Sequence, residues 1–432
     1  MTVTGTHVRS SWRGVAWGAF FASWGGWLLD GFTASVYAFV ALPATQYLLP
    51  ASHIPLKYES FFLAAFFSVF LIGWGTAFIF GPLGDRYGRF RVLAISIALY
   101  GVGSVLSGLS TNAYEFMAFR FITGLGIGAE WFVGGTSVAE IFPEDRRVFG
   151  AGLFHSGYYF GYFFAALAAL FLQSIIGFRG MLILGVIPVA FIMYIRYTTK
   201  EPERWERARE RMGGNISSWK AFRSIFSREY LRVTVVSSVV MVAVILGLWS
   251  GTVYVPTAIE KMAAIDGIAK TQFLRLSALG GAVTSTLTIV GCILMPLMAE
   301  RVGRRITLIV FLACMAVSVY VIYGIVYYLH SLTDMFALLV LLGFGGADFS
   351  VFSLWLPELY PTEARSSGFG AVTTLGRYFA AGFEFLIGII TLAVGFGHGI
   401  AYTAIAFVAV MPLVFLIRET RGKGLREEVL RG

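Results

Sequence analysis

Several ionisable side chains stand inside long apolar stretches of this chain and are the first candidates for chemistry. They are Asp30, Arg120, Glu130, Asp348 and Arg377. A charge at the depth of a bilayer core is costly unless it is paired or hydrated, so each marks a candidate path for an ion or a substrate. A carboxyl group can bind and release a proton, and a guanidinium can hold a carboxylate through two parallel hydrogen bonds. The chemistry on offer is therefore reversible binding of protons and of an anion.

Asp30 and Arg120 are expected to lie at similar heights in the membrane. Asp30 is roughly 16 residues from the start of its apolar stretch and Arg120 about five from the end of its own, at ~1.5 Å per residue. We expect an ion pair in which Arg120 keeps the carboxylate ionised until a proton or the substrate breaks the contact. This swing would couple proton binding to transport. The alternative is a static ion pair that fixes helix register.

Glu130 and Asp348 occupy matching places in two similar segments. Gly128-Ala-Glu130 corresponds to Gly346-Ala-Asp348, and the residues that follow match at the same offset. We predict that both acids face one central cavity and contact substrate, with Glu130 also on the proton path. Inherited packing positions are the alternative.

Arg377 stands near the middle of its apolar stretch, and we predict that it binds an anionic substrate. A guanidinium at that depth suits a carboxylate, because its planar fork donates two hydrogen bonds. The alternative is an ion pair with Asp348 or with Glu384. Glu384 itself is expected near the outer surface, where a charge needs no partner.

These residues require long helices to position them. The chain is 57% hydrophobic and 13% charged, against about 25% charged in soluble domains. A transmembrane helix needs roughly 20 apolar residues, and twelve stretches qualify. Their approximate limits are 14–42, 60–80, 91–110, 115–138, 148–172, 180–197, 232–256, 275–297, 306–328, 333–356, 367–393 and 399–417. The sequence therefore predicts an all-α membrane protein with twelve transmembrane helices.

Charged turns repeat at half the chain length. Asp85, Arg86, Gly88 and Arg89 return at a constant offset as Glu300, Arg301, Gly303 and Arg304. We expect the arginines to reach acids at the ends of neighbouring helices and to act as latches that open and close with the cavity. The predicted latch residues are Asp85, Arg89, Glu140, Arg147, Glu300, Arg304, Glu358 and Arg365. Loop solubility and topology alone are the alternative explanation.

The net charge of +9 is explained by the topology of the chain in the membrane rather than by binding of nucleic acid. With the N-terminus inside, most Lys and Arg fall in cytoplasmic segments, as the positive-inside rule requires. Anionic lipid is the expected partner of these charges, and both termini are predicted to be cytoplasmic. We find no metal-ligand spacing, no phosphate-binding loop and no catalytic constellation. No metal, cofactor or enzymatic activity is therefore expected.

The repeated turn resembles the cytoplasmic loop motif of the major facilitator superfamily of secondary transporters. Asp30-Gly-Phe, Gly-Ala-Glu130-Trp and Leu-Gly-Arg377 resemble the sialate and monocarboxylate proton symporters. Glu201-Pro-Glu-Arg-Trp and Pro357-Glu-Leu-Tyr-Pro-Thr are similar to motifs of the sugar-porter and metabolite:proton symporter branches. The resemblance implies two pseudo-symmetric six-helix bundles with a cavity between them. We predict bundles at 1–198 and 230–432, joined by a cytoplasmic linker at 199–229.

These observations together predict a proton-coupled symporter in the cell membrane. It would import a small organic anion, such as a monocarboxylate, sugar acid or aromatic acid, by alternating access, and we expect a monomer. The first alternative is a sugar/proton symporter, against which the near absence of Gln and Asn from the apolar stretches argues. The second is a nutrient sensor that keeps the fold without transport.

Overall fold

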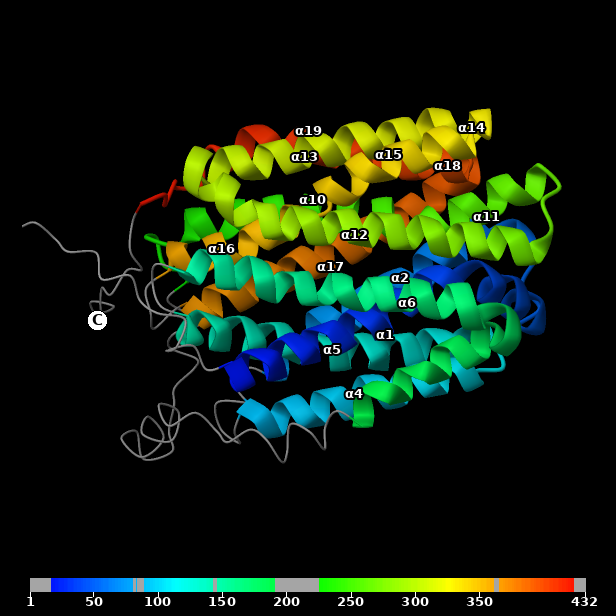
Figure 1. Ribbon diagram of the computed structural model, residues 1–432, viewed down its shortest axis with the longest axis horizontal. Helices are drawn as coiled ribbons and strands as arrows, with labels where there is room; N and C mark the ends of the chain where they lie inside the picture. Colours follow the sequence, from blue (N-terminus) through cyan, green and yellow to red (C-terminus); the bar gives the residue numbers. More distant parts are fainter. Residues whose placement is uncertain are drawn as a thin grey trace, which may run out of the picture.

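The computed structural model describes residues 17–80, 83, 89–142, 146–190, 225–360 and 365–422, and within these ranges the regular structure is helical. Ten helical stretches of the described chain are long and apolar enough to cross a membrane. The helices lie side by side along the longest axis of the molecule (Figure 1). The chain is therefore an all-α, multi-pass membrane protein, as predicted.

The first half of the chain forms five long helices and three short 3₁₀ turns. They are α1 (Trp17–Ala51), η2 (Leu56–Tyr58), α2 (Glu59–Thr76), η3 (Ala77–Ile79), α4 (Arg89–Leu109), α5 (Ala113–Ile141), α6 (Arg147–Ile183) and η5 (Leu184–Val186). α6 is broken at Gly177, whose φ of 63° lies in the region that favours glycine. This break separates the fifth predicted transmembrane helix from the sixth.

The second half contains more interrupted helices. They are α10 (Leu231–Val253), α11 (Val255–Ile265), α12 (Lys270–Val302), α13 (Arg304–Val321), η6 (Ile322–Val326), α14 (Tyr327–Leu329), α15 (Leu332–Gly345), α16 (Asp348–Leu359), α17 (Arg365–Val394), α18 (Phe396–Ala401) and α19 (Thr403–Val414). α11 begins directly after α10, with Pro256 in its first turn, where proline is favoured. A second break, at Gly346 and Ala347, puts Asp348 in the first turn of α16.

Helices distant in sequence meet along two lines, which we call the α2–α17 seam and the α6–α12 seam. Within the first half α1 packs on α6 and α5 packs on both α2 and α4, while α10 packs on α17 and α19 in the second. α11 and α16 lie at opposite ends of the molecule (Figure 1). We call these the Lys261 end and the Arg304 end, after a residue at each. The bundle limits at 198 and 230 stay a prediction, since most of the linker lies outside the described residues.

Glycines let α1 and α6 approach closely and so fix the position of Tyr158. A Cβ added to Gly31 would lie 2.0 Å from the Tyr158 carbonyl oxygen, and one added to Gly161 would lie 2.0 Å from the carbonyl oxygen of Leu28. Both distances are far inside van der Waals contact, so neither position has room for a side chain.

We therefore expect Gly31→Ala to separate α1 from α6 and to destabilise the protein by about 1–3 kcal/mol or more. The measurement is the midpoint of thermal unfolding in detergent, followed by tryptophan fluorescence. Gly382→Ala is the matched control, because a Cβ there meets nothing within 4 Å. Equal midpoints for the two variants would show that the α1–α6 contact is not tight.

Candidate functional site

The phenol of Tyr158 in α6 lies among charged groups from three other helices. Its hydroxyl interacts electrostatically with Asp30 of α1, Arg377 of α17 and Arg120 of α5. The Tyr158 side chain is buried, and its hydroxyl also lies beside Ser35 of α1. We call Asp30, Arg120, Tyr158 and Arg377 the central cluster, because it joins charges from both halves of the chain.

Tryptophan rings enclose the central cluster. The ring centroid of Tyr158 lies 5.0 Å from that of Trp27, 6.2 Å from that of Trp74 and 5.6 Å from that of Trp249. These rings come from α1, α2 and α10, so both halves contribute to the enclosure. Water is replaced by aromatic surface here, and electrostatic interactions between the charged groups are strengthened.

Asp30 and Glu130 form a pair of buried acids beside α1. A Cβ added to Gly26, one helical turn before Asp30, would lie 2.5 Å from Oε2 of Glu130. The two carboxyl groups interact electrostatically with each other and with the Tyr100 phenol of α4. Two carboxylates this close in a dry site repel each other, and one bound proton relieves the repulsion. The arrangement therefore suits proton binding.

The predicted ion pair between Asp30 and Arg120 is not formed in this structure. The Arg120 guanidinium lies over the aromatic faces of Tyr37 and Phe70, with Cζ 4.4 Å and 4.3 Å from the two ring centroids. Its three nitrogens have no hydrogen-bond partner. Cation–π attraction to the two rings takes the place of the carboxylate, although both side chains lie beside Tyr158.

Arg377 reaches from α17 across the α2–α17 seam to aromatic rings of the first half. Its Cζ lies 4.6 Å from the ring centroid of Trp74 and 4.7 Å from that of Trp131. The side chain is buried, and its Nη2 donates no hydrogen bond. It forms no ion pair with Asp348 or Glu384, both of which are described. A guanidinium with an unused donor, clamped between two rings, is suited to receive a carboxylate.

Asp348 stands apart from the central cluster. It lies in the first turn of α16, beside Tyr159 of α6 and Cys292 of α12. The Tyr159 hydroxyl donates to the carbonyl oxygen of Gly346, 3.0 Å away, at the break before α16. The structure thus places Glu130 against α1 and Asp348 at the α6–α12 seam, and a cavity shared by the two acids stays a prediction.

Glu384 was expected near the surface, and that expectation is wrong. Its side chain is 1% exposed and accepts hydrogen bonds from Ser250 Oγ at 2.6 Å and from the Tyr254 hydroxyl at 2.7 Å. α17 continues to Val394, so Glu384 lies well inside the helix. Its position seven residues after Arg377, on the same helix face, was the signal that could have identified it.

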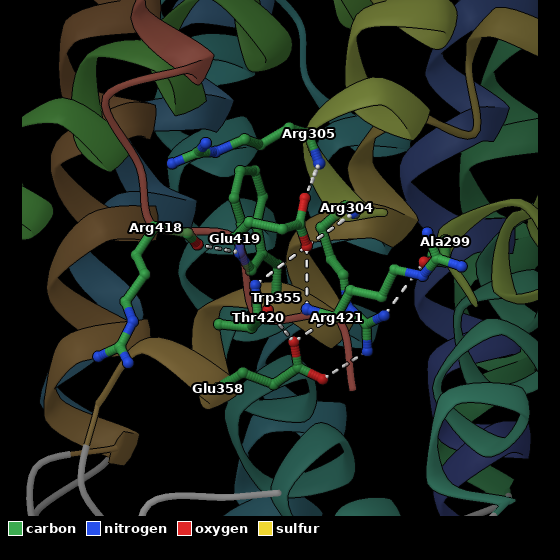
Figure 2. Close-up of polar contacts among 9 residues, drawn as sticks. All are labelled: Ala299, Arg304, Arg305, Trp355, Glu358, Arg418, Glu419, Thr420 and Arg421. Atoms are coloured by element: carbon green, nitrogen blue, oxygen red, sulfur yellow. Dashed lines mark hydrogen bonds and ion pairs between the residues drawn. The ribbon is translucent and has the colours of Figure 1, made fainter. Parts of the chain in front are cut away.

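Figure 2 shows a network of polar contacts at the Arg304 end. Arg304 donates from Nη2 to Glu358 Oε1 at 2.9 Å and from Nε to Glu358 Oε2 at 3.2 Å, forming the predicted ion pair. Glu358 also accepts from Thr420 Oγ1. This network joins the start of α13, the end of α16 and the chain after α19. Its role as a latch stays a prediction.

Glu419 is a member of this network that the sequence did not indicate. Partial burial alone would raise the pKa of Glu419, but hydrogen bonds from the backbone N–H groups of Arg305, Arg304, Arg421 and Thr420 outweigh it and lower the pKa. Glu300 is exposed and has no ion pair among the described residues. The other predicted latch positions fall outside what the structure describes, either entirely (Asp85) or in their side chains (Arg89, Glu140, Arg147 and Arg365).

The Lys261 end carries an ion pair between the two halves. Lys261 Nζ of α11 donates to Glu59 Oε1 at the start of α2, and Gln46 Nε2 donates to Glu59 Oε2 at 3.0 Å. A cavity of about 370 Å³ lies beside this pair, with Lys261 and Lys270 among its lining residues. Ala64 lies in α2 about one helical turn after Glu59, and a Cβ added to Gly388 of α17 would lie 2.9 Å from its Cβ. The α2–α17 seam is therefore closed at this end.

We expect Lys261→Ala to open the Lys261 end more often. A partly exposed ion pair is worth up to about 1 kcal/mol, so the open state should gain roughly fivefold in population. The measurement is the rate at which an impermeant thiol reagent modifies Ala64→Cys, in a background with Cys292 and Cys314 replaced by Ala. Lys270→Ala is the control. Equal modification rates in the two variants would show that the ion pair between Lys261 and Glu59 does not hold this end closed.

Within the described residues, no group of three or more His, Cys, Asp or Glu could hold a metal ion. The side chains of the central cluster are one carboxyl group, two guanidinium groups and a phenol surrounded by indole rings. This set can bind protons and an anion, as their residue types suggested. The sequence did not indicate Tyr158, because an uncharged tyrosine in an apolar stretch resembles an ordinary packing residue.

A family model described as Major Facilitator Superfamily matches residues 15–383 of the chain. A probable 4-methylmuconolactone transporter of Cupriavidus pinatubonensis is 29% identical, covering 93% of this chain and 90% of the relative. The sialic acid transporter NanX of Escherichia coli is 22% identical and covers 92% of each chain. A structure of the proton:xylose symporter XylE superposes with a TM-score of 0.71 at 17% identity, covering 95% of this chain and 98% of the other.

Proposed function

The chain belongs to the Major Facilitator Superfamily, and on that premise we propose that it is a proton-coupled symporter for a small organic anion. It is a transporter of metabolites rather than an enzyme. The proposed cycle is alternating access, in which the central cluster faces first one side of the membrane and then the other. We further propose that the Arg304 end faces the cytoplasm, with both termini there, and that the Lys261 end faces outward.

The observation that carries the proposal is the position of Arg377. It is the cation of the second half in the central cluster, its Nη2 is unused, and it lies against Trp74 and Trp131 of the first half. An anion bound there would contact both halves at once, which links binding to their relative movement. The relative NanX is named for sialic acid, whose carboxyl group is ionised at neutral pH.

Asp30 and Glu130 are the proposed proton site. They interact with each other and with Tyr100, and Asp30 also interacts with Tyr158. In this scheme, Arg120 is available to Asp30 when its contact with Tyr37 and Phe70 loosens, and Asp348 lines the substrate path near the α6–α12 seam. The Arg304–Glu358 pair acts as a latch at the cytoplasmic end.

A sugar/proton symporter is the second candidate, because the fold matches that of a xylose symporter. Sugar hydroxyls are usually bound by amide side chains, and Gln46 and Gln173, two of the described glutamines, make their hydrogen bonds outside the central cluster. Gln173 donates to the carbonyl oxygen of Phe39 at 2.8 Å, and Gln46 donates to Glu59. The central cluster contains charges and aromatic rings instead, which favours an anion. A non-transporting sensor would bind substrate without moving it.

The test is uptake of a labelled panel into proteoliposomes with an alkaline interior. The panel holds monocarboxylates, sugar acids, aromatic acids and neutral xylose. We expect at least one acid to accumulate and a protonophore to abolish the accumulation. Accumulation of xylose but of no acid would establish the second candidate, and binding without uptake would establish the sensor.

A further inference from the structure

Glu384 is a buried carboxyl group at the α2–α17 seam that the proposed function leaves without a role. It lies two turns from Arg377 along α17, toward the Lys261 end. Gly388, one turn further, packs against Ala64, and Phe385 lies 6.4 Å from Phe61 between ring centroids. The groups around Glu384 are therefore dry when the seam is closed, as in this structure.

Two hydroxyl groups, one from Ser250 in α10 and one from Tyr254 between α10 and α11, hold this carboxyl group. Ser250 Oγ lies 2.6 Å from Oε2, and the Tyr254 hydroxyl lies 2.7 Å from Oε1. A hydroxyl group can donate to a carboxylate, or accept from a protonated carboxyl after rotation of its own hydrogen. The site can thus satisfy both protonation states of Glu384.

The charged and titratable groups that face Glu384 come from α1 and α10. Tyr37 of α1 and Tyr254, at the end of α10, interact with it electrostatically. Tyr323 of η6 interacts with Tyr254 in turn. From α2, the side facing α17 offers Phe61 and Ala64 and no charge until Glu59, which pairs with Lys261. Among the described residues, no Lys, Arg or His forms an ion pair with Glu384.

Tyr37 connects this carboxyl group to the central cluster. Its hydroxyl donates to the Leu63 carbonyl oxygen of α2 at 3.0 Å, and its ring carries the Arg120 guanidinium at 4.4 Å. Arg120 also interacts with Tyr158. A change of charge at Glu384 would therefore alter its electrostatic interaction with Tyr37. Through Tyr37 it would act on α2, which forms the other side of the seam, and on Arg120.

We propose that Glu384, with Ser250 and Tyr254, is a second proton-binding site, and that its protonation permits the α2–α17 seam to close. A carboxylate in a closed, dry seam with no cation is costly, so the ionised form favours an open, hydrated seam. The neutral form packs against α2 at little cost. This role rests on the proposed proton coupling, and it adds a carboxyl group in the second half to the pair in the first.

The first test is infrared spectroscopy of the purified protein in lipid over a pH series, with no substrate added. We expect the wild-type spectrum to contain a protonated-carboxyl band that titrates and is missing from Glu384→Gln. Tyr254→Phe removes a donor to the carboxylate and should raise the titration midpoint by ~1–2 pH units. Glu115→Gln, at an exposed acid, should leave the spectrum unchanged. Superimposable wild-type and Glu384→Gln spectra would overturn the assignment.

The second test measures seam opening through the same Ala64→Cys reporter. We expect the thiol to become more reactive as pH rises, because ionisation of Glu384 opens the seam, after correction for the reagent's own pH dependence on a model thiol. Glu384→Gln should remove this dependence and hold reactivity at its low-pH level. A dependence that survives in Glu384→Gln contradicts the proposal. Neither test requires transport, so absence of gradient-driven uptake would refute the proposed function alone.

Discussion

Replacing Arg377 by Lys is expected to lower the apparent affinity for the transported anion by about a hundredfold. Lysine keeps the charge but loses the planar fork that binds a carboxylate through two hydrogen bonds. Hydrogen bonds to charged groups contribute about 1.5–3 kcal/mol, and each cation–π contact contributes about 0.5–2 kcal/mol. A loss near 3 kcal/mol corresponds to roughly two powers of ten in affinity. The measurement is the concentration dependence of uptake in proteoliposomes.

Arg179→Lys is the matched control for this substitution. Arg179 also lies over aromatic rings, with Cζ 4.9 Å from the Tyr47 centroid and 5.4 Å from that of Phe178. It donates to the Gly108 carbonyl oxygen at 3.1 Å, away from the central cluster. We expect unchanged affinity in this variant. Full affinity in Arg377→Lys would show that Arg377 does not bind the anion.

Asp30→Asn is expected to abolish accumulation driven by a pH gradient while leaving substrate exchange intact. An amide keeps the size of the side chain but cannot bind and release the proton. For one proton per anion, a gradient of one pH unit stores about 1.4 kcal/mol and supports roughly tenfold accumulation. The variant should equilibrate the anion without concentrating it. The readout is the ratio of internal to external labelled acid at steady state, beside the rate of exchange.

Asp266→Asn serves as the control, since Asp266 is partly exposed and lies 3.5 Å from His330 at the Lys261 end. It should accumulate the acid as the wild type does. If Asp30→Asn also concentrates the acid tenfold, Asp30 is not on the proton path. Glu130 would then be the remaining carboxyl group of the pair.

The fold could be predicted from the sequence because its signals are long and repeated. Apolar stretches of the length of a membrane helix and the recurrence of the turn at Asp85 as the one at Glu300 both follow directly from the residues. The structure has an interruption that the stretches did not show, the break before Asp348 within the predicted stretch 333–356. Single glycines in apolar runs are compatible with a continuous helix, so their effect depends on the neighbouring helices.

The charged residues of the site were predicted, but their partners were not. Counting residues along a helix gives the height of a side chain, and Asp30 and Arg120 do lie beside the same phenol. Counting residues does not, however, give the direction in which a side chain points. Arg120 turns to Tyr37 and Phe70 because these rings are brought to it by α1 and α2. Contacts of this kind arise only once the helices are packed.

Tyr158 and Glu384 show the same limit in different ways. Tyr158 carries no charge, so nothing in its type distinguished it from the other aromatic residues of α6. Glu384 was assigned to the outer surface by its height in the apolar stretch, but its side chain points inward to Ser250 and Tyr254. Both gain significance from residues far away in sequence, namely Asp30 and Arg377 for Tyr158, and Ser250 and Tyr254 for Glu384.

The most direct test of proton-coupled anion transport is the pH inside proteoliposomes when substrate is added. The vesicles contain a pH-sensitive dye and begin with equal pH on both sides, and the acid identified by the uptake panel is added outside. The account predicts acidification of the interior at the rate of acid uptake, well above that of protein-free vesicles, and its loss in Asp30→Asn. Uptake of the acid with no change of internal pH beyond the protein-free control would contradict it.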